Sequence, residues 1–466
     1  MLKKNDTLTL DITELNSLGF GVARHGGMVV FVSGAVRGDT VEARVIRVTK
    51  SYAVARTERV LSASPDRRED FCPAKGCGGC AFRLLDDRVE AIEKKNGVLA
   101  CMKHENLSHV TVRDTVVGER RLHYRNKAQF PAAKKKDGSL YFGFFAPKSH
   151  RVIECPHCAL QSPCFASILD TLAPLLTACG VSAYDEETHT GLLRHVYMRA
   201  AENGEVLLTL VLNGKALPRE QEIVQTLRAK HPEIIGILVN VQTAKTNVVC
   251  GDEYRLLWGR EYLTDTLAGV TLDIPSASFY QVNHEMTEKL YAEAHRLAAL
   301  TGKETVLDLY CGVGSIGLSM ARDAREVIGI EIVPSAIEYA RRNAEKNGID
   351  NARFFCADAF DTHKIMDRLS HERGKAVRAD VVILDPPRKG CDSALLDYIA
   401  KSLSPDSIVY VSCNPATLAR DMKVLDALGY TGDTVTPFDL FPRTAHVESV
   451  VALTRRLDNE LRERMN

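Results

Sequence analysis

The sequence predicts a multidomain α/β protein whose three parts follow one another along the chain. Short β-favouring runs between glycine turns fill residues 1–62 and predict a small OB-like β-barrel. Mixed helical and hairpin patterns in residues 63–272 predict a central α+β domain with a cysteine cluster. Strands alternate with helices through residues 273–466, which predicts a doubly wound, mostly parallel, Rossmann-like sheet.

The composition is that of an ordinary globular protein, with 45% hydrophobic and 26% charged residues and a formal net charge of zero. We find no apolar run near the ~20 residues that a membrane span requires, and no secretory signal at the N-terminus. These features predict a cytoplasmic protein with no membrane partner, and nothing in the sequence indicates an obligate protein partner. In that reducing compartment, 13 cysteines favour metal binding or catalysis over disulfides.

The barrel is predicted from β-favouring runs at 28–32, 40–48 and 52–61, with turns at the glycines between them. Five short strands that close on one another would form an OB-like fold, which often binds RNA. The alternative is a domain that only stabilises the rest of the chain.

Three cysteines, Cys72, Cys77 and Cys80, lie within nine residues and are separated by glycines. Closely spaced thiols of this kind bind zinc or an iron–sulfur cluster, and either group needs a fourth ligand. Spacing alone does not choose that ligand. The candidates form a second group further along the chain: Cys155, Cys158 and Cys164.

The central region also carries a basic stretch. Residues 111–151 contain ten Lys/Arg against three Asp/Glu, and a Lys-Asp-Gly-Ser turn predicts a hairpin there. Within it, Tyr124, Arg125, Asn126 and Lys127 combine an aromatic ring with cations, a mixture that suits stacked bases and phosphates. We predict that these four residues contact RNA; the alternative is a plain solvated face.

In the rest of the central domain we find patterns of secondary structure but no candidate catalytic or binding residues. Helical patterns occur at 86–102, near 165–178 and near 218–230, and paired β runs surround the last two.

Glycine and acidic residues follow successive predicted strands of the C-terminal region. The glycines in Asp308-Leu-Tyr310-Cys-Gly312-Val-Gly314-Ser315 let a ligand approach the backbone, but they fit a dinucleotide equally well. The next three strands each end at a carboxylate: Glu331, Asp358 and Asp385. Glu331 suits ribose hydroxyls, Asp358 suits an adenine amino group, and carboxylates suit a cationic sulfonium better than a pyrophosphate. The sequence therefore predicts S-adenosylmethionine as the cofactor; the alternative is an inert Rossmann-like domain.

Cys413 lies where the predicted site should form. The β-favouring run 408–411 leads through Ser412 to this cysteine, and Pro415 then marks a helix start. This places the cysteine at the carboxyl edge of the sheet, where open α/β folds build their sites, and a helix N-terminus lowers a thiol pKa. We therefore predict a nucleophilic thiolate; the alternative is a buried cysteine that only fills space.

Taken together, these segments resemble the iron–sulfur-containing RNA uracil-5-methyltransferases. The motifs that carry the resemblance run through nearly the whole chain: CPAKGCGGC, HYRNKAQFP, SFYQVN, LDLYCGVGSIGL, ILDPPRKG, YVSCNPATLARD and FPRTAHVESV. The resemblance implies an N-terminal TRAM domain, a C-terminal class I S-adenosylmethionine-dependent fold, and a segment near 90–120 that packs against the C-terminal domain.

The resemblance also implies roles for single residues. It makes Cys413 the nucleophile, Glu448 the base that removes the uracil C5 proton, and Asp385 a contact of cofactor and target base. The implied cofactor contacts are Gln281, Tyr310, Gly312, Gly314, Ser315, Glu331, Asp358 and Asp385. The implied ligands of a [4Fe–4S] cluster are Cys72, Cys77, Cys80 and Cys158, with Cys155 as the runner-up for the fourth.

Uracil chemistry explains why a cysteine and a carboxylate are needed. Addition of a thiolate to C6 makes an enolate whose C5 can take a methyl group, and a base must then remove the C5 proton. His446 is the competing base because its ordinary pKa lies near neutrality. The implied substrate is a flipped uridine of 23S ribosomal RNA. The alternatives are transfer RNA, or a role as a non-catalytic RNA-binding assembly factor.

Overall fold

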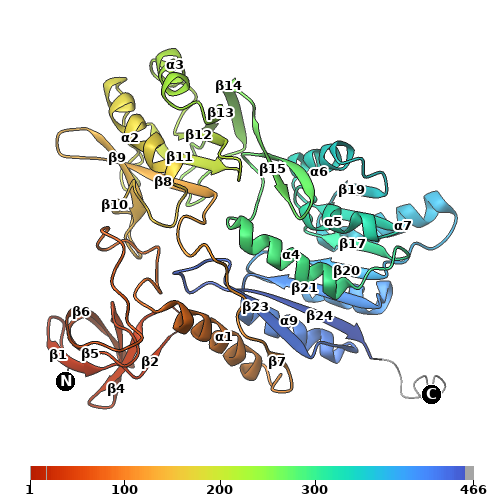
Figure 1. Ribbon diagram of the computed structural model, residues 1–466, viewed down its shortest axis with the longest axis horizontal. Helices are drawn as coiled ribbons and strands as arrows, with labels where there is room; N and C mark the ends of the chain where they lie inside the picture. The colour runs from red at the N-terminus through yellow and green to blue at the C-terminus, as the bar shows by residue number, and fades with distance from the viewer. Residues whose placement is uncertain (1, 17, 457–466) are drawn as a thin grey trace.

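The computed structural model describes residues 2–16 and 18–456, so the outer domain limits at residues 1 and 466 lie outside the described residues. Figure 1 shows three bodies around a common centre: the N-terminal β unit, a central sheet with its helices, and a large C-terminal sheet. The predicted multidomain α/β architecture is confirmed. No helix in the described part of the chain is long and apolar enough to cross a membrane.

The N-terminal unit is a six-stranded sheet whose side chains alternate between core and solvent. In β5, for example, Val41, Ala43 and Val45 are buried while the residues between them are not, as a strand with one covered face requires. In sheet order the described strands are β1 (Thr7–Asp11), β5 (Thr40–Val48), β6 (Tyr52–Ser62), β4 (Met28–Ser33), β3 (Gly21–His25) and β2 (Glu14–Leu15). The sequence predicts five strands, and the sixth strand of the described sheet is β2, which has only two residues.

The central sheet is antiparallel except for one parallel pair, and two helices cover it. Strands β11 and β12 are buried along their whole length, which places them in the middle of the sheet. Helices α2 (Pro163–Ala178) and α3 (Glu220–Lys230) pack their apolar faces on it, as the helical patterns predict. In sheet order the strands are β10 (Val152–Glu154), β9 (Leu140–Phe145), β8 (Lys127–Lys134), β11 (Leu193–Ala200), β12 (Val206–Leu212), β13 (Ile234–Val241) and β14 (Glu253–Gly259). The predicted hairpin is the β8–β9 pair.

The hairpin of β15 (Tyr262–Leu267) and β16 (Val270–Pro275) belongs to the C-terminal core, because Leu267, Leu272 and Ile274 are buried in it. The predicted limit between residues 272 and 273 therefore falls inside a strand. The other inner limit, at residues 62 and 63, stays a prediction.

The C-terminal sheet has the strand order of a doubly wound fold. Five parallel strands, β19 (Ala352–Cys356), β18 (Glu326–Glu331), β17 (Thr305–Leu309), β20 (Val381–Leu384) and β21 (Ser407–Ser412), are followed by antiparallel β24 (Glu448–Arg455) and β23 (Thr434–Phe438). The short β22 (Tyr430–Thr431) also pairs with β24. The strand order reverses between β17 and β20, the point at which such sheets bind their ligands. The helices are α4 (His284–Ala298), α5 (Ser315–Met320), α6 (Pro334–Lys346), α7 (Thr362–Arg373), α8 (Ser393–Tyr398) and α9 (Pro415–Ala427).

Helix α1 (Asp87–His104) and β7 (Thr111–Val112) extend this sheet from the other end of the chain. β7 pairs with β23, and Val98 and Met102 of α1 are buried in the core that α9 also lines. Figure 1 shows α1 running from the N-terminal unit to α9. The segment near 90–120 therefore packs on the sheet that carries the predicted nucleophile.

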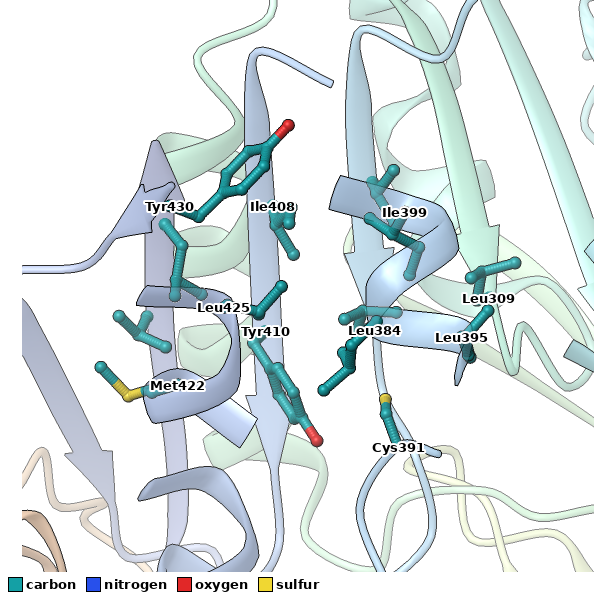
Figure 2. Close-up of a cluster of buried hydrophobic side chains, with 14 of the residues drawn as sticks. Leu309, Leu384, Cys391, Leu395, Ile399, Ile408, Tyr410, Met422, Leu425 and Tyr430 are labelled. Carbon is teal, nitrogen blue, oxygen red and sulfur yellow. The ribbon is translucent and has the colours of Figure 1, made fainter. Parts of the chain in front are cut away.

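One face of the sheet is sealed by α8 and α9. Figure 2 shows Met422 and Leu425 of α9 beside Ile408 and Tyr410 of β21. The hydroxyl of the buried Tyr410 donates a hydrogen bond of 2.7 Å to Asp421 of α9, so this polar atom is satisfied inside the core. The packing fixes the end of β21, where Cys413 begins the next turn.

Candidate active site

The antiparallel pairing of β21 with β24 brings the predicted nucleophile and base together. The last pair of the ladder is Ser412 with Ser449, and Cys413 and Glu448 are the next residues along the two chains. They lie close enough for the charge of Glu448 to act on the Cys413 thiol. Asn414 then caps α9 by accepting a hydrogen bond of 3.1 Å from the Ala416 N–H. The predicted strand-to-helix turn at Cys413 is confirmed.

Asp385 follows β20, which neighbours β21, and its charge acts on both Cys413 and Glu448. The guanidinium of Arg388 acts on the same two groups with the opposite sign. The Arg388 carbonyl accepts a hydrogen bond of 3.0 Å from the Asn414 side chain, which ties this loop to the turn at Cys413. No role is predicted for Arg388 from the sequence. Its position in the ILDPPRKG motif, three residues after Asp385, is the feature that could have indicated one.

Glu448 is buried, with 3% of its surface exposed, and its Oε2 has no hydrogen-bond partner among the described residues. Burial, followed by the charge of Asp385, raises the pKa of Glu448 to about 8, although Arg388 opposes the shift. Burial raises the pKa of Asp385 to about 7. Carboxyl groups with pKa values near neutrality are suited to accepting and releasing protons in a reaction.

The prediction of a lowered thiol pKa is wrong. Burial, and then the charges of Glu448 and Asp385, raise the pKa of the Cys413 thiol to about 11, with Arg388 acting in the other direction. The helix N-terminus is outweighed because removal from water and two carboxylates all disfavour the thiolate. The protonated thiol is therefore the favoured form of Cys413 at neutral pH.

His446 is disfavoured as the base. Burial, followed by the charges of Arg388, Arg125 and Lys94, lowers its pKa to about 4. Its ring packs edge-on against Phe441, with ring centroids 6.0 Å apart. Because a proton acceptor weakens as its pKa falls, Glu448 is the stronger base of the two.

A cleft of about 1090 Å³ opens onto Cys413 and His446. Pockets for small ligands have volumes of about 300–1,000 Å³, so this cleft is large for a small molecule alone. Its walls come from segments far apart in the sequence: Leu15, Asn16 and Leu18 of the N-terminal unit, Gly78 and Gly79 of the cysteine-rich loop, and Glu93, Lys94 and Asn96 of α1. The thiol thus lies at a meeting point of all three regions.

Glu331, the residue predicted to bind the ribose hydroxyls, joins the loops that follow β17 and β18. Glu331 accepts hydrogen bonds from the N–H groups of Gly312, at 3.2 Å, and Val333, at 2.9 Å. A Cβ atom added at Gly312 would meet nothing within 4 Å, so a ligand can approach this backbone. Tyr310 has a φ of +65°, an uncommon conformation for a tyrosine and one that clusters at functional sites.

The other predicted cofactor residues lie on the same edge. The Ser315 hydroxyl is 2.8 Å from the hydroxyl of Tyr291. Asp358 accepts a hydrogen bond of 2.9 Å from the Phe360 N–H. At Gly314, with φ at +84°, an added Cβ would press on the ring of Phe354 at 3.0 Å. The residues thus gather at one sheet edge, and their contacts with the cofactor stay predictions.

Two exposed apolar residues at this edge have no predicted role. Ile332, next to Glu331, is 59% exposed, and Phe360, two residues after Asp358, is 55% exposed. Large apolar side chains left in water beside predicted ligand residues are typical of a binding surface.

The predicted RNA contacts at 124–127 divide into two pairs. Tyr124 is 4% exposed, and its hydroxyl donates to the Pro442 carbonyl at 3.0 Å; Asn126 is 9% exposed and donates to the Gln281 carbonyl at 2.9 Å. The prediction that these two contact RNA is corrected, because both are buried where the central domain meets the C-terminal domain. Gln281 is itself buried there.

Arg125 and Lys127 remain partly exposed. The Arg125 guanidinium lies over the rings of Tyr124 and Phe441, and the Lys127 ammonium lies 5.6 Å from the ring centre of Phe279. Burial, with the charges of Arg199 and Arg125, lowers the pKa of Lys127 to about 8. Phe279 is 64% exposed and was not predicted as a site residue, although it lies in the SFYQVN motif.

The two cysteine groups meet in the structure. Burial and then the charge of Cys158 raise the pKa of the Cys77 and Cys80 thiols, and the neighbouring Cys155 lowers the pKa of Cys158. Among residues 2–16 and 18–456, however, no group of three or more His, Cys, Asp or Glu side chains is arranged to hold a metal ion. The thiols are neighbours, and the predicted cluster stays a proposal.

Comparison with known families matches residues 2–57 to the TRAM domain and residues 89–456 to the family described as tRNA (Uracil-5-)-methyltransferase. An uncharacterised RNA methyltransferase of Halalkalibacterium halodurans is 41% identical over 455 residues, covering 97% of this chain and 98% of that protein. One from Clostridium acetobutylicum is 38% identical over 459 residues, with the same coverage.

A similar solved structure is that of Pyrococcus abyssi tRNA (uracil-54, C5)-methyltransferase in complex with S-adenosyl-L-homocysteine. It superimposes with a TM-score of 0.75 at 28% sequence identity, over 96% of this chain and 99% of that one. The fold and site thus define an S-adenosylmethionine-dependent RNA methyltransferase with a TRAM domain. The chain belongs to the tRNA (uracil-5-)-methyltransferase family. The predicted cofactor, reaction class and RNA substrate are thereby confirmed.

Proposed function

We propose that this chain methylates C5 of a uridine in 23S ribosomal RNA, with Cys413 as the nucleophile and Glu448 as the base. The observation that carries the proposal is that Cys413, Glu448 and Asp385 come together at the ends of neighbouring strands, with Cys413 on the wall of a large cleft. A thiol and a carboxylate that face each other are what addition at C6 and proton removal at C5 require.

The steps balance among the uracil ring, these two side chains, water and the methyl donor. The Cys413 thiol loses its proton to water, its Sγ attacks C6, and the electrons of the C5=C6 bond move to O4 as an enolate. C5 then takes the methyl group that bound S-adenosylmethionine would supply. Glu448 takes the proton from C5, the electrons of that C–H bond restore C5=C6, and the C6–S bond breaks to return the thiolate.

When bound, S-adenosylmethionine supplies the methyl group and a positive charge near these carboxylates. In its absence, burial and then the charges of Glu448 and Asp385 favour the protonated Cys413 thiol, which is less nucleophilic than the thiolate. Arg388 favours the ionised forms of both Cys413 and Glu448, and therefore assists the two proton losses that the reaction needs.

Replacement of the nucleophile tests this function. We expect Cys413→Ala to abolish methylation while calorimetric binding of S-adenosylmethionine is unchanged. The wild-type enzyme should also form an SDS-stable adduct with RNA that contains 5-fluorouridine, because fluorine cannot leave C5 as a proton. Methylation by Cys413→Ala would contradict the proposal.

We also propose a [4Fe–4S] cluster held by Cys72, Cys77, Cys80 and Cys158. The support is a donor set made only of sulfur, in which the Cys158 charge acts on Cys77 and Cys80. Cys155 is the runner-up for the fourth position. Methyl transfer moves no net electrons, so the cluster would be structural and hold the loop that forms one wall of the cleft.

Anaerobic purification tests the cluster. The wild-type protein should be brown and contain about four iron atoms per chain, as a [4Fe–4S] cluster requires, and Cys80→Ser should be colourless and free of iron. Cys179→Ser, which changes a buried cysteine of the central core, is the matched control and should keep the colour. A colourless wild type with one zinc ion would contradict the assignment.

The ribosomal substrate is favoured by the cysteine-rich loop, and transfer RNA is favoured by the likeness to the Pyrococcus abyssi enzyme. Mapping of 5-methyluridine in ribosomal and transfer RNA from cells that lack this gene separates the two. We expect the loss of one or more sites in 23S RNA with transfer RNA intact; the reverse pattern would replace the ribosomal substrate by transfer RNA.

A further inference from the structure

Residues 439–447 join β23 to β24, carry His446 and lead directly into Glu448; we refer to this segment as the base loop. We propose that Lys94, on α1, is a positioning residue that holds the base loop so that Glu448 can take the C5 proton. The inference rests on the proposed function, because it concerns the second half of that reaction.

Lys94 is a buried lysine that binds the start of the base loop. It is 2% exposed, and its ammonium donates to Asp439 Oδ1, to the Phe441 carbonyl at 3.1 Å and to Glu90 Oε1 at 2.9 Å. A lysine has three N–H donors, so this side chain is fully used. One ammonium thus fixes both a side chain and a backbone carbonyl of the base loop to α1.

Glu90 repeats the attachment four residues further on, at Arg443. Its Oε1 accepts a hydrogen bond of 2.6 Å from the Arg443 backbone N–H, and its Oε2 accepts from the Arg443 guanidinium at 3.2 Å. Arg443 is 1% exposed and also pairs with Asp87. Arg121 pairs with Glu90 at 2.9 Å and with Asp439 at 2.5 Å. Asp87 also pairs with Arg68 at 2.8 Å, so each carboxylate of the network, Asp439, Glu90 and Asp87, faces at least two cations.

Other segments hold the base loop between these points. The Phe82 N–H, two residues after Cys80, donates to the Arg443 carbonyl at 2.9 Å. The Tyr124 hydroxyl donates to the Pro442 carbonyl at 3.0 Å, and Arg125 lies over the ring of Phe441. The conformation of the base loop is therefore set by α1, the cysteine-rich loop and the buried part of the HYRNKAQFP motif.

The catalytic carboxylate depends on this support. Glu448 Oε2 lacks a hydrogen-bond partner within the described part of the chain, so no protein donor orients this oxygen. Its position follows from β24 on one side and from the base loop on the other. A displacement of about 1 Å at a reacting group can cost roughly 100-fold in rate.

The test uses a step that only the base controls. Methyl transfer precedes proton removal, so a misplaced Glu448 should leave the methylated uridine bound to Cys413. With ordinary uridine RNA and S-adenosylmethionine, we expect Lys94→Met to accumulate an SDS-stable, methylated adduct, as Glu448→Gln should. Turnover by Lys94→Met should fall roughly 100-fold. A purely structural defect would lower adduct and turnover together.

Lys95→Met is the matched control, because the neighbouring lysine of α1 undergoes the same change but pairs with the exposed Asp114. It should behave as the wild type. If Lys94→Met does not fold, Lys94→Met/Asp439→Asn removes one charge of each sign and is measured in its place; loss of folding in both would make the role structural and overturn the inference.

Adduct that accumulates in Glu448→Gln but not in folded Lys94→Met would overturn the inference and leave the proposed function intact. Absence of adduct in Glu448→Gln, together with absence of a 5-fluorouridine adduct in the wild type, would overturn the proposed function itself.

Discussion

Two buried carboxylates stand at opposite ends of the base loop and have opposite surroundings. Asp439 is 0% exposed and faces the cations of Lys94 and Arg121. Glu448 is 3% exposed, and the nearby Asp385 has the same charge as its own. The same side-chain chemistry at the same depth is therefore paired with two cations at one end, while at the other end it has no ion pair among the described residues and only the charge of Arg388 opposes that of Asp385.

The difference separates structure from reactivity. A buried charge with partners on several sides fixes the chain around it, and removing one partner is costly. Burial, followed by the charge of Asp385, makes Glu448 hold its proton more strongly and raises its pKa to about 8 against the opposing charge of Arg388. Asp439 therefore suits a structural role and Glu448 suits the proposed role of base, so substitutions at the two ends should have separable effects.

The largest expected effect is on turnover. Glu448→Gln keeps the shape of the side chain but cannot accept a proton, so we expect steady-state methylation to fall roughly 10²–10⁴-fold. Folding should be retained, as circular dichroism would show. A fall of less than about ten-fold would mean that Glu448 is not the base, since general-base catalysis typically contributes more than that.

The second effect is on stability. Asp439→Asn leaves Lys94 and Arg121 buried without one of their counter-charges, so we expect the free energy of unfolding to fall by about 3–5 kcal/mol. Denaturant unfolding of the wild type and the variant measures the difference. Asp114→Asn, at an exposed partner of Lys95, should leave the midpoint unchanged. Equal stability of Asp439→Asn and the wild type would remove the contrast between the two carboxylates.

The third effect is on the thiol. In the enzyme without cofactor, the charges of Glu448 and Asp385 help to raise the pKa of Cys413 to about 11. Glu448→Gln removes one of these charges, so the thiol pKa should fall and alkylation of Cys413 by iodoacetamide at pH 8 should become faster. Each unit of pKa corresponds to about ten-fold more thiolate. Peptide mass spectrometry reports this cysteine alone, and slower alkylation in the variant would contradict the account.

The smallest effect is a pH dependence of stability. The folded-state pKa of Glu448, about 8, exceeds its ordinary value of 4.5, so the folded state binds more protons between these pH values. The contribution of Glu448 to stability therefore declines as pH rises from about 4.5 to 8. Gln cannot ionise, so its contribution to stability does not change with pH. The melting temperature of Glu448→Gln minus that of the wild type should therefore increase as the pH rises from about 4.5 to 8. A constant difference would argue against a raised pKa for this buried carboxyl.

The sequence predicts what depends on local patterns. Hydrophobic periodicity places α2, α3 and the alternating strands of the C-terminal sheet, because side-chain spacing reports burial within a few residues. The turn at Cys413 is likewise visible as a strand followed by Asn414 and Pro415. The resemblance then points to Glu448, which the structure places near Cys413 at the start of the strand that pairs with β21.

What depends on distant partners is not visible in the sequence. Lys94 and Asp439 are 345 positions apart, and the local sequence around each residue does not show that the two form an ion pair. Tyr124 resembles a stacking residue until the Pro442 carbonyl is seen to bind its hydroxyl. The thiol pKa is mispredicted for the same reason, since the helix start is local and the two carboxylates belong to other strands.

Release of hydrogen from C5 tests the pairing of thiol and carboxylate most directly. With RNA carrying tritium at uridine C5, the wild-type enzyme should release one tritium to water for each methyl group transferred. Glu448→Gln should transfer methyl groups up to about one per enzyme, as a trapped covalent intermediate requires, while releasing almost no tritium. Tritium release by Glu448→Gln in the wild-type ratio to methyl transfer would show that another group removes the proton and would contradict the account.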